Sequence, residues 1–310
     1  MSLAKIKNTE ISNVARALRL PFLSASILPF IFGSVSAASK NFLLPEFILG
    51  LLTVVFTHLG ANLINDYADS KSGVDWQDQK FYGFFGGSKL IQENVFKEKF
   101  YLGATLFCFF VASAAVFILS AILETNLPLI FYSLIVFLGF YYSHKPLQFS
   151  YRRLGEPVIF ILFGPALVVG GYFIQSRIFL DFRSLILSLP SGFLIMAILF
   201  ANEIPDYQED KKCGKLTWVS LTGPERAYII YALMMLAAFL AIALNIRLGY
   251  ISNWGYLSFL FVLPVIKAAS VLKRDYTDKI RLVHSSKLTI MAQILVTIIL
   301  IIGAISCKRS

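Results

Sequence analysis

The 310-residue chain is 57% hydrophobic and only 15% charged, with a mean hydropathy of +0.71. Soluble domains have about 45–50% apolar and about 25% charged residues, so this composition excludes a soluble enzyme, a disordered chain and a disulfide-rich secreted domain. The net charge of +10 indicates loop charges that set topology rather than a nucleic-acid partner, because the chain is so apolar. The three cysteines lie far apart in the sequence, which argues against a zinc site.

The apolar residues form long continuous runs. A helix needs about 20 apolar residues to cross a membrane, whereas a β-barrel shows short segments of alternating hydrophobicity. We therefore expect an all-α polytopic membrane protein in which residues 1–310 form a single transmembrane domain. We predict nine transmembrane helices, at residues 20–38, 43–65, 101–123, 127–144, 156–175, 184–203, 226–246, 251–272 and 285–306.

The distribution of Lys and Arg predicts the orientation of the chain. With the N-terminus in the cytoplasm and the C-terminus outside, most basic residues lie on the inner side. The long polar stretches 66–100 and 204–226 are then cytoplasmic loops, in a cytoplasmic or inner membrane. An alternative for the first run is a signal peptide, since Val35-Ser36-Ala37 resembles a signal-peptidase site.

The second run ends in the acidic segment ANLINDYADSKSGVD. Asn62, Asn65, Asp66 and Asp69 are spaced i, i+3, i+4 and i+7, so on a helix they share one face. Asp75 and Asp78 follow in the loop. This spacing predicts a carboxylate-rich face at the cytoplasmic end of the helix.

The sixth run ends in a second acidic segment, ANEIPDYQEDKKCGKLT. Asn202, Asp206 and Asp210 are spaced i, i+4 and i+8 and again share a face, and we expect Pro205 to bend the helix there. One such cluster is explained equally well as a solvated helix end. Two clusters of the same form on the same membrane side favour a shared functional site.

Carboxylate and amide oxygens at this density suit Mg²⁺, which favours carboxylates together with substrate phosphates. An anion bridged through the metal would be held there, and nearby basic residues would neutralise the outer oxygens of a diphosphate. Each of these lysines, taken singly, is also explained as a topology charge. The residues predict an Mg²⁺ site for a phosphorylated substrate.

The two acidic motifs resemble those of the UbiA superfamily of intramembrane prenyltransferases. Asn65 and Asp69 match the first family motif, while Gly73 stands where many members have Asp, and Asp75 follows two residues later. Asp206 and Asp210 match the second motif, in which Asn202 replaces the first acid. The resemblance implies a UbiA-like helical bundle.

Other segments resemble the MenA branch, whose members prenylate 1,4-dihydroxy-2-naphthoate. These segments are FFGGSKLIQE at 84–93 and RRLGEPVIFILFGPALVVGGYF at 152–173, while RALRLPFLSASILPFIFGS at 16–34 resembles the first-helix signature of the whole family. GKLT at 214–217 places Lys215 at the family's diphosphate-facing lysine. The resemblance covers nearly the whole chain and implies Mg²⁺-dependent transfer of a polyprenyl chain from an allylic diphosphate to an aromatic acceptor.

This reading assigns roles to individual residues. The metal ligands would be Asn65, Asp66, Asp69, Asn202, Asp206 and Asp210, and the catalytic carboxylates among them Asp66, Asp69, Asp206 and Asp210. The substrate-binding residues would be Arg19, Asn62, Lys89, Tyr142, Lys145 and Lys215. Arg19 would pair with the acceptor carboxylate or simply anchor the helix at the interface. Tyr142 would face the allylic cation or serve in packing.

Two other functions stay open from the sequence. The same metal site would serve a prenyltransferase with another acceptor, namely 4-hydroxybenzoate, homogentisate or a glycerol-phosphate lipid. A cation transporter with acidic rings is more distant, because transporter sites lie near the bilayer midplane and these carboxylates lie at helix ends. The expected partners are the polyprenyl diphosphate, the acceptor and membrane lipid, with no obligate protein partner.

Overall fold

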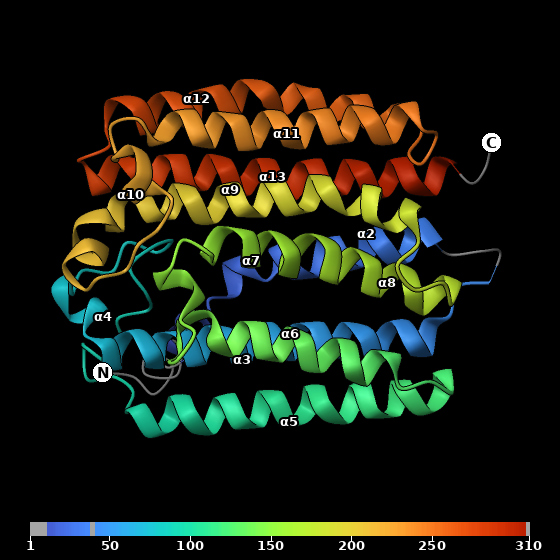
Figure 1. Cartoon of the computed structure of the whole chain (residues 1–310), viewed down its shortest axis with the longest axis horizontal. Helices are drawn as coiled ribbons and strands as arrows, with labels where there is room; N and C mark the ends of the chain where they lie inside the picture. Colours follow the sequence, from blue (N-terminus) through green and yellow to red (C-terminus); the bar gives the residue numbers. More distant parts are fainter. Residues whose placement is uncertain (1–10, 38–40, 308–310) are drawn as a thin grey trace, which may run out of the picture.

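A computed structural model describes residues 11–37 and 41–307. The long helices lie side by side and nearly parallel (Figure 1), and the described residues contain no β-strand. This all-helical architecture follows from the composition, because lipid offers no partner for an exposed backbone N–H or C=O and a helix satisfies both internally.

The chain begins with a short 3₁₀ turn, η1, and the helices follow in sequence order. The first half contains η1 Leu20–Phe22, α2 Ser24–Ala37, α3 Leu44–Ser72, α4 Val74–Gln77, α5 Glu98–Leu123, α6 Leu127–Ser143, η2 Phe149–Tyr151 and α7 Gly155–Ile161. The second half contains the π-helix η3 Leu162–Ala166, α8 Leu167–Ser176, α9 Phe182–Lys212, α10 Val219–Thr222, α11 Ala227–Arg247, η4 Asn253–Phe261, α12 Val262–Arg274 and α13 Lys279–Cys307.

Eight helical segments of the described chain are long and apolar enough to cross a membrane. The remaining predicted span corresponds to α6, an apolar helix of 17 residues. That length is at the lower limit of about 17–25 residues for a crossing helix. An integral membrane protein is therefore confirmed, whereas nine crossings and the orientation of the termini stay predictions.

The two helices that carry the acidic motifs are longer than the apolar runs predict. Helix α3 continues to Ser72, where Gly73 takes the left-handed conformation with φ +87° and ends the helix. Helix α9 continues through Pro205 to Lys212. The expected loops 66–100 and 204–226 are thus helical in their first part, so both motifs lie on rigid helix rather than on loop.

Small residues allow α2 and α8 to pack closely. A Cβ on Gly33 would lie 2.1 Å from the Val168 carbonyl oxygen, and one on Gly171 would lie 2.3 Å from the Phe30 carbonyl oxygen. Such small-residue contacts are the usual basis of helix association in lipid, where burial of apolar surface gives no driving force. The closely packed α2 and α8 lie in the middle of the bundle, where both contact α3 and α9.

Candidate active site

The last turns of α3 and α9 lie at the same end of the bundle (Figure 1) and form walls of one cavity of about 260 Å³. Both predicted motifs contribute to its lining: Asn62, Asn65 and Asp69 from α3, and Asn202, Asp206 and Asp210 from α9. The structure thus brings the two motifs together, as their position on matching helix ends predicts.

Asp69 and Asp210 have oxygen atoms that no other described group uses. Asp69 Oδ1 and Asp210 Oδ2 are buried, and within residues 11–37 and 41–307 neither accepts a hydrogen bond. The other oxygen of Asp210 lies 3.3 Å from Lys215 Nζ. A buried carboxylate oxygen without a donor is costly, so these two atoms indicate a cation or a donor that binds from the cavity.

Lys215 is held in the cavity wall by the backbone around it. Its N–H donates to the Asp210 carbonyl over 2.8 Å, and the next residue, Leu216, forms a parallel bridge with Arg152. Burial alone would lower the pKa of Lys215, but the charges of Asp210 and Asp69 raise it well above its ordinary value. Lys215 is therefore a fixed cation close to the carboxylates of Asp69 and Asp210.

The segment Gly86–Lys89 supplies backbone and side-chain donors to the carboxylates. Gly86 N–H donates to Asp206 Oδ2 over 2.9 Å, and Lys89 Nζ donates to Asp75 Oδ1 over 2.8 Å and to the Asp75 carbonyl over 3.0 Å. Gly87 has φ +77°, and a Cβ there would lie 2.7 Å from both Asp75 carboxylate oxygens. Gly86 also has a positive φ of +74°, so both positions favour glycine by backbone conformation, and Gly87 is in addition required by contact.

Asp75 is a site residue that the motif analysis left unassigned. It lines the cavity, pairs with Lys89 and is buried. Burial and the nearby charge of Asp69 raise the pKa of Asp75 to about 7. The sequence signal was present, since Asp75 stands two residues beyond the position where the family motif has its third acid.

Asp66 and Lys145 are predicted site residues that do not line the cavity. Asp66 is buried, and its two oxygens accept hydrogen bonds from the Arg19 guanidinium and from Ser88 N–H. Lys145 is exposed. At 100° per residue, Asp66 lies at the edge of the helix sector that Asn65 and Asp69 occupy, which turns it toward Arg19. The geometry supports a structural role for Asp66 and gives none to Lys145.

The predicted amide and aromatic side chains do face the cavity. Asn65 Nδ2 donates to Ser143 Oγ over 2.6 Å, which orients its oxygen, and Asn62 Nδ2 donates to the Leu18 carbonyl over 3.3 Å. Asn202 Oδ1 accepts a hydrogen bond from Ser286 Oγ over 2.7 Å. Tyr142 is also part of the lining. These contacts fix the amides from α6, from α13 and from the turn at Leu18.

Lys279 is a further residue near the site that the local motifs gave no reason to single out. It begins α13, and its Nζ lies 2.8 Å from Asp78 Oδ2 and 3.1 Å from Glu209 Oε2. Both acids line the cavity. Lys279 therefore ties the segment after α3 to the end of α9, a contact between residues 201 positions apart.

The donor set fits Mg²⁺, although the described residues contain no group of three His, Cys, Asp or Glu side chains placed to hold a metal ion. Mg²⁺ usually keeps several waters and binds through one or two carboxylates plus substrate phosphates. The free oxygens of Asp69 and Asp210 supply that number of carboxylates, one from α3 and one from α9. These two residues are therefore the ones that would hold the ion.

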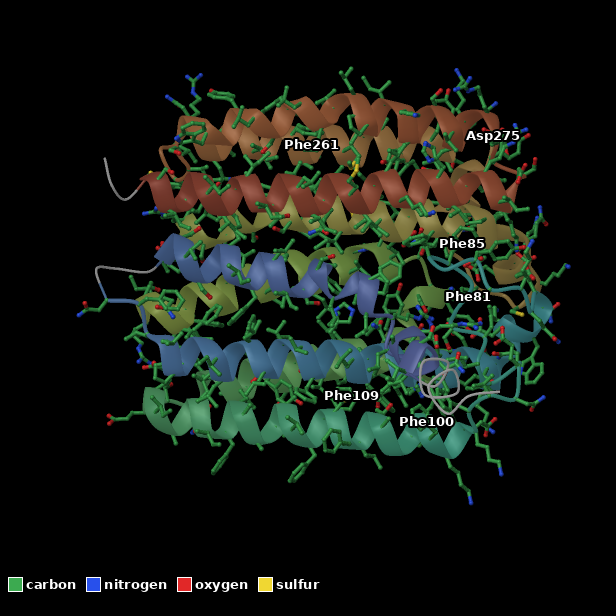
Figure 2. The ribbon with its side chains drawn as sticks, turned by 180° about the vertical axis from the view of Figure 1, so that it is seen from behind. Phe81, Phe85, Phe100, Phe109, Phe261 and Asp275 are labelled. Carbon is green, nitrogen blue, oxygen red and sulfur yellow. The ribbon has the colours of Figure 1, made fainter. Side chains whose placement is uncertain are left out.

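An apolar chamber of about 150 Å³ adjoins the polar cavity, and both cavities are lined by His58, Ala61, Gly139, Leu162 and Phe163. Phe109 of the chamber lies between the ends of the bundle, whereas Phe85 of the polar cavity lies at its carboxylate end (Figure 2). The site therefore has a charged head compartment and an apolar tail compartment.

These features define an integral membrane protein whose site suits an amphipathic anion. The model of the UbiA prenyltransferase family matches residues 26–290. The chain therefore belongs to the UbiA prenyltransferase family, and it is a prenyltransferase.

Comparisons with individual proteins agree. A UbiA prenyltransferase domain-containing protein 1 homologue of Drosophila melanogaster is 30% identical over 259 residues, which are 81% of this chain and 67% of the fly protein. A 1,4-dihydroxy-2-naphthoate octaprenyltransferase of Bacillus subtilis is 28% identical over 250 residues, which are 79% of this chain and 77% of that protein. The chain spans about two thirds of the length of its animal relatives, 67% for the fly protein and 65% for the mouse protein.

The fold is also found in a solved structure. A UbiA homologue from Archaeoglobus fulgidus bound to GPP and Mg²⁺ has a TM-score of 0.62 to this chain at 15% sequence identity. The similarity covers 96% of this chain and 100% of the archaeal chain. The UbiA-like fold predicted from the motifs is confirmed.

Proposed function

We propose that this protein transfers a polyprenyl chain from an allylic diphosphate to 1,4-dihydroxy-2-naphthoate, with Mg²⁺ as cofactor. The observation that carries the proposal is the junction of a carboxylate- and lysine-lined cavity with an apolar chamber. A prenyl diphosphate has the matching form, with a polyanionic head on a hydrocarbon tail. The archaeal homologue bound to GPP and Mg²⁺ supports the same substrate class.

The diphosphate would bind between the free carboxylate oxygens of Asp69 and Asp210 and the cation of Lys215. Mg²⁺, when bound by the two carboxylates, supplies the positive charge that attracts the diphosphate and stabilises it as a leaving group. Lys215 contributes a second fixed positive charge, and its raised pKa keeps it protonated at neutral pH. Charge stabilisation by preorganised groups is usually the largest catalytic term.

The bond changes balance without an added base. The bond between the prenyl C1 and the diphosphate oxygen breaks, and its electron pair leaves with the diphosphate. A ring carbon of the acceptor then donates an electron pair to C1 and forms the new carbon–carbon bond. The bond from that ring carbon to the carboxylate breaks, CO₂ leaves, and the electron pair returns to the ring.

The acceptor would bind on the Arg19 side of the cavity. Arg19 also lines an adjoining pocket together with Phe22, Phe81 and Phe84, so a guanidinium and aromatic rings are available to a planar aromatic acid. Asp66 pairs with one nitrogen of Arg19, and a guanidinium has five N–H donors. Arg19 therefore keeps donors for an acceptor carboxylate, and the Bacillus subtilis relative supports a naphthoate acceptor.

The test is prenylation by purified protein in detergent, with Mg²⁺ and farnesyl or geranylgeranyl diphosphate. The acceptor panel contains 1,4-dihydroxy-2-naphthoate, 4-hydroxybenzoate and homogentisate, and products are measured by mass spectrometry. We expect a product with loss of CO₂ from the naphthoate alone, which EDTA abolishes and which Asp69→Asn and Asp210→Asn reduce at least 100-fold.

Each other outcome changes a defined part of the proposal. A product with a different acceptor would overturn the naphthoate assignment and keep the metal site. A product that persists in EDTA, or in both Asn variants, would overturn the metal site. No product with this panel or with a glycerol-phosphate acceptor, from protein that stays folded, would overturn prenyl transfer and favour cation transport.

A further inference from the structure

The junction between the polar cavity and the apolar chamber is a narrow region that we call the neck. Its walls are the five residues common to both linings: His58 and Ala61 from α3, Gly139 from α6, and Leu162 and Phe163 from η3. A prenyl chain whose diphosphate lies among the carboxylates has to pass this region to reach the chamber. The size of the opening therefore bears on which chains fit.

Two walls of the neck are held in place. His58 Nδ1 forms a hydrogen bond with Ser26 Oγ, and the His58 ring packs edge-on against Phe163 with 5.5 Å between ring centroids. Leu162 and Phe163 begin a π-helical turn that contains Pro165. π-Helical turns are uncommon and frequently occur at functional sites. Since these side chains are fixed, the opening depends on the third wall, α6.

Gly139 is the α6 residue at the neck, and no contact with residues 11–37 or 41–307 requires a glycine there. It lies inside the helix, its φ is not positive, and a Cβ added to it would meet no atom of the described residues within 4 Å. Gly50, another chamber glycine, differs, because a Cβ there would lie 2.5 Å from Ile174 Cδ1. A glycine in a helix interior is less favourable than alanine by roughly 0.5–1 kcal/mol, so its presence calls for another reason.

We propose that Gly139 keeps the neck open for the prenyl chain and so determines which chain lengths the enzyme accepts. The proposal rests on the proposed function, because it assigns the chamber to the prenyl tail. From Gly139 to Leu127, which also lines the chamber, α6 extends about 18 Å at 1.5 Å per residue. A side chain at position 139 would therefore close the chamber near its polar end and exclude most of a long tail.

The test compares Gly139→Ala and Gly139→Leu with wild type on dimethylallyl, geranyl, farnesyl and geranylgeranyl diphosphate. The matched control is Gly103→Leu, since Gly103 lies in α5, is exposed and lines neither cavity, and an added Cβ there would also have no atom of the described part of the chain within 4 Å. The measurements are kcat/KM for each donor and the rise in unfolding temperature that each donor causes with Mg²⁺.

For Gly139→Leu we expect the ratio of geranylgeranyl to dimethylallyl kcat/KM to fall at least 10-fold, with Gly139→Ala between it and wild type. Gly103→Leu should keep the wild-type ratio. An unchanged ratio, or an equal loss for all four donors from folded protein, overturns the proposal.

The thermal measurement separates this failure from failure of the proposed function. If no acceptor is prenylated but long donors stabilise wild type more than Gly139→Leu, the acceptor assignment fails and the neck is supported. If Gly139→Leu does not fold, Gly139→Ala decides by the same ratio.

Discussion

The substitution Gly87→Ala tests whether the Gly86–Lys89 segment positions the polar cavity. Gly87 has φ +77°, and its added Cβ would lie 2.7 Å from both carboxylate oxygens of Asp75. Asp75 has little room to retreat, because it is buried and its Oδ1 is held by Lys89 Nζ at 2.8 Å. The variant therefore has to displace either the segment or the ion pair.

The magnitude has two parts. A residue with a Cβ in the left-handed region costs about 1–2 kcal/mol. Loss of a hydrogen bond between charged groups, here Lys89 to Asp75, costs about 1.5–3 kcal/mol more. Because 1.4 kcal/mol corresponds to a factor of ten, and the contact positions the cavity without touching the substrate, the second part sets an upper limit of roughly 10- to 100-fold on the loss of kcat/KM for the prenyl diphosphate.

Gly249→Ala is the control for the cost of the left-handed backbone conformation alone. Gly249 has φ +70°, and no atom among the residues that the structure describes lies within 4 Å of an added Cβ; it lies in the turn after α11, outside the linings of both cavities. Both variants should lose unfolding temperature, but only Gly87→Ala should lose activity. The assay is kcat/KM with thermal unfolding of the same samples. Equal activity of the two variants would refute the reasoning.

Two further predictions concern charged groups at the site. Lys215→Met should lower kcat/KM for the diphosphate roughly 10- to 100-fold, since a charge-assisted contact is worth about 1.5–3 kcal/mol, and Lys215→Arg should restore part of the lost kcat/KM. Lys145 is exposed, so Lys145→Met should have little effect in the same steady-state kinetics, and a loss as large as that of Lys215→Met would contradict the assignment of Lys215 to the diphosphate. Asp75 has its pKa raised from 3.8 to about 7, so between these values the folded state holds a proton that the unfolded chain releases, and stability falls as pH rises through that window. The unfolding temperature should therefore fall more between pH 5 and pH 8 for wild type than for Asp75→Asn. An equal fall for the two proteins would speak against the buried position of this carboxyl.

The acidic motifs show how far local spacing predicts a site. Helical periodicity placed Asn65 and Asp69 on one face, and the structure has both in the cavity lining. It also placed Asp66 on that face, yet Asp66 pairs with Arg19 and Ser88 N–H instead. Spacing gives the angle between two side chains on one helix, but not which neighbour each will meet.

The loop residues show a different limit. Lys89 and Lys145 were equal candidates by charge and position, but Lys89 is buried against Asp75 while Lys145 is exposed. Lys279 was not a candidate, although it binds Asp78 and Glu209. These differences depend on how segments distant in the chain pack at one end of the bundle.

The sequence by itself determined the properties that depend on local chemistry. Composition dictated a helical membrane protein, because lipid requires internally satisfied backbone, and the two motifs indicated carboxylate faces through the helical repeat. Only the tertiary structure decided that Asp69 Oδ1 and Asp210 Oδ2 accept no hydrogen bond from the described residues, and where Gly139 meets the neck. Those properties arise from contacts between helices, which the order of residues within one helix does not specify.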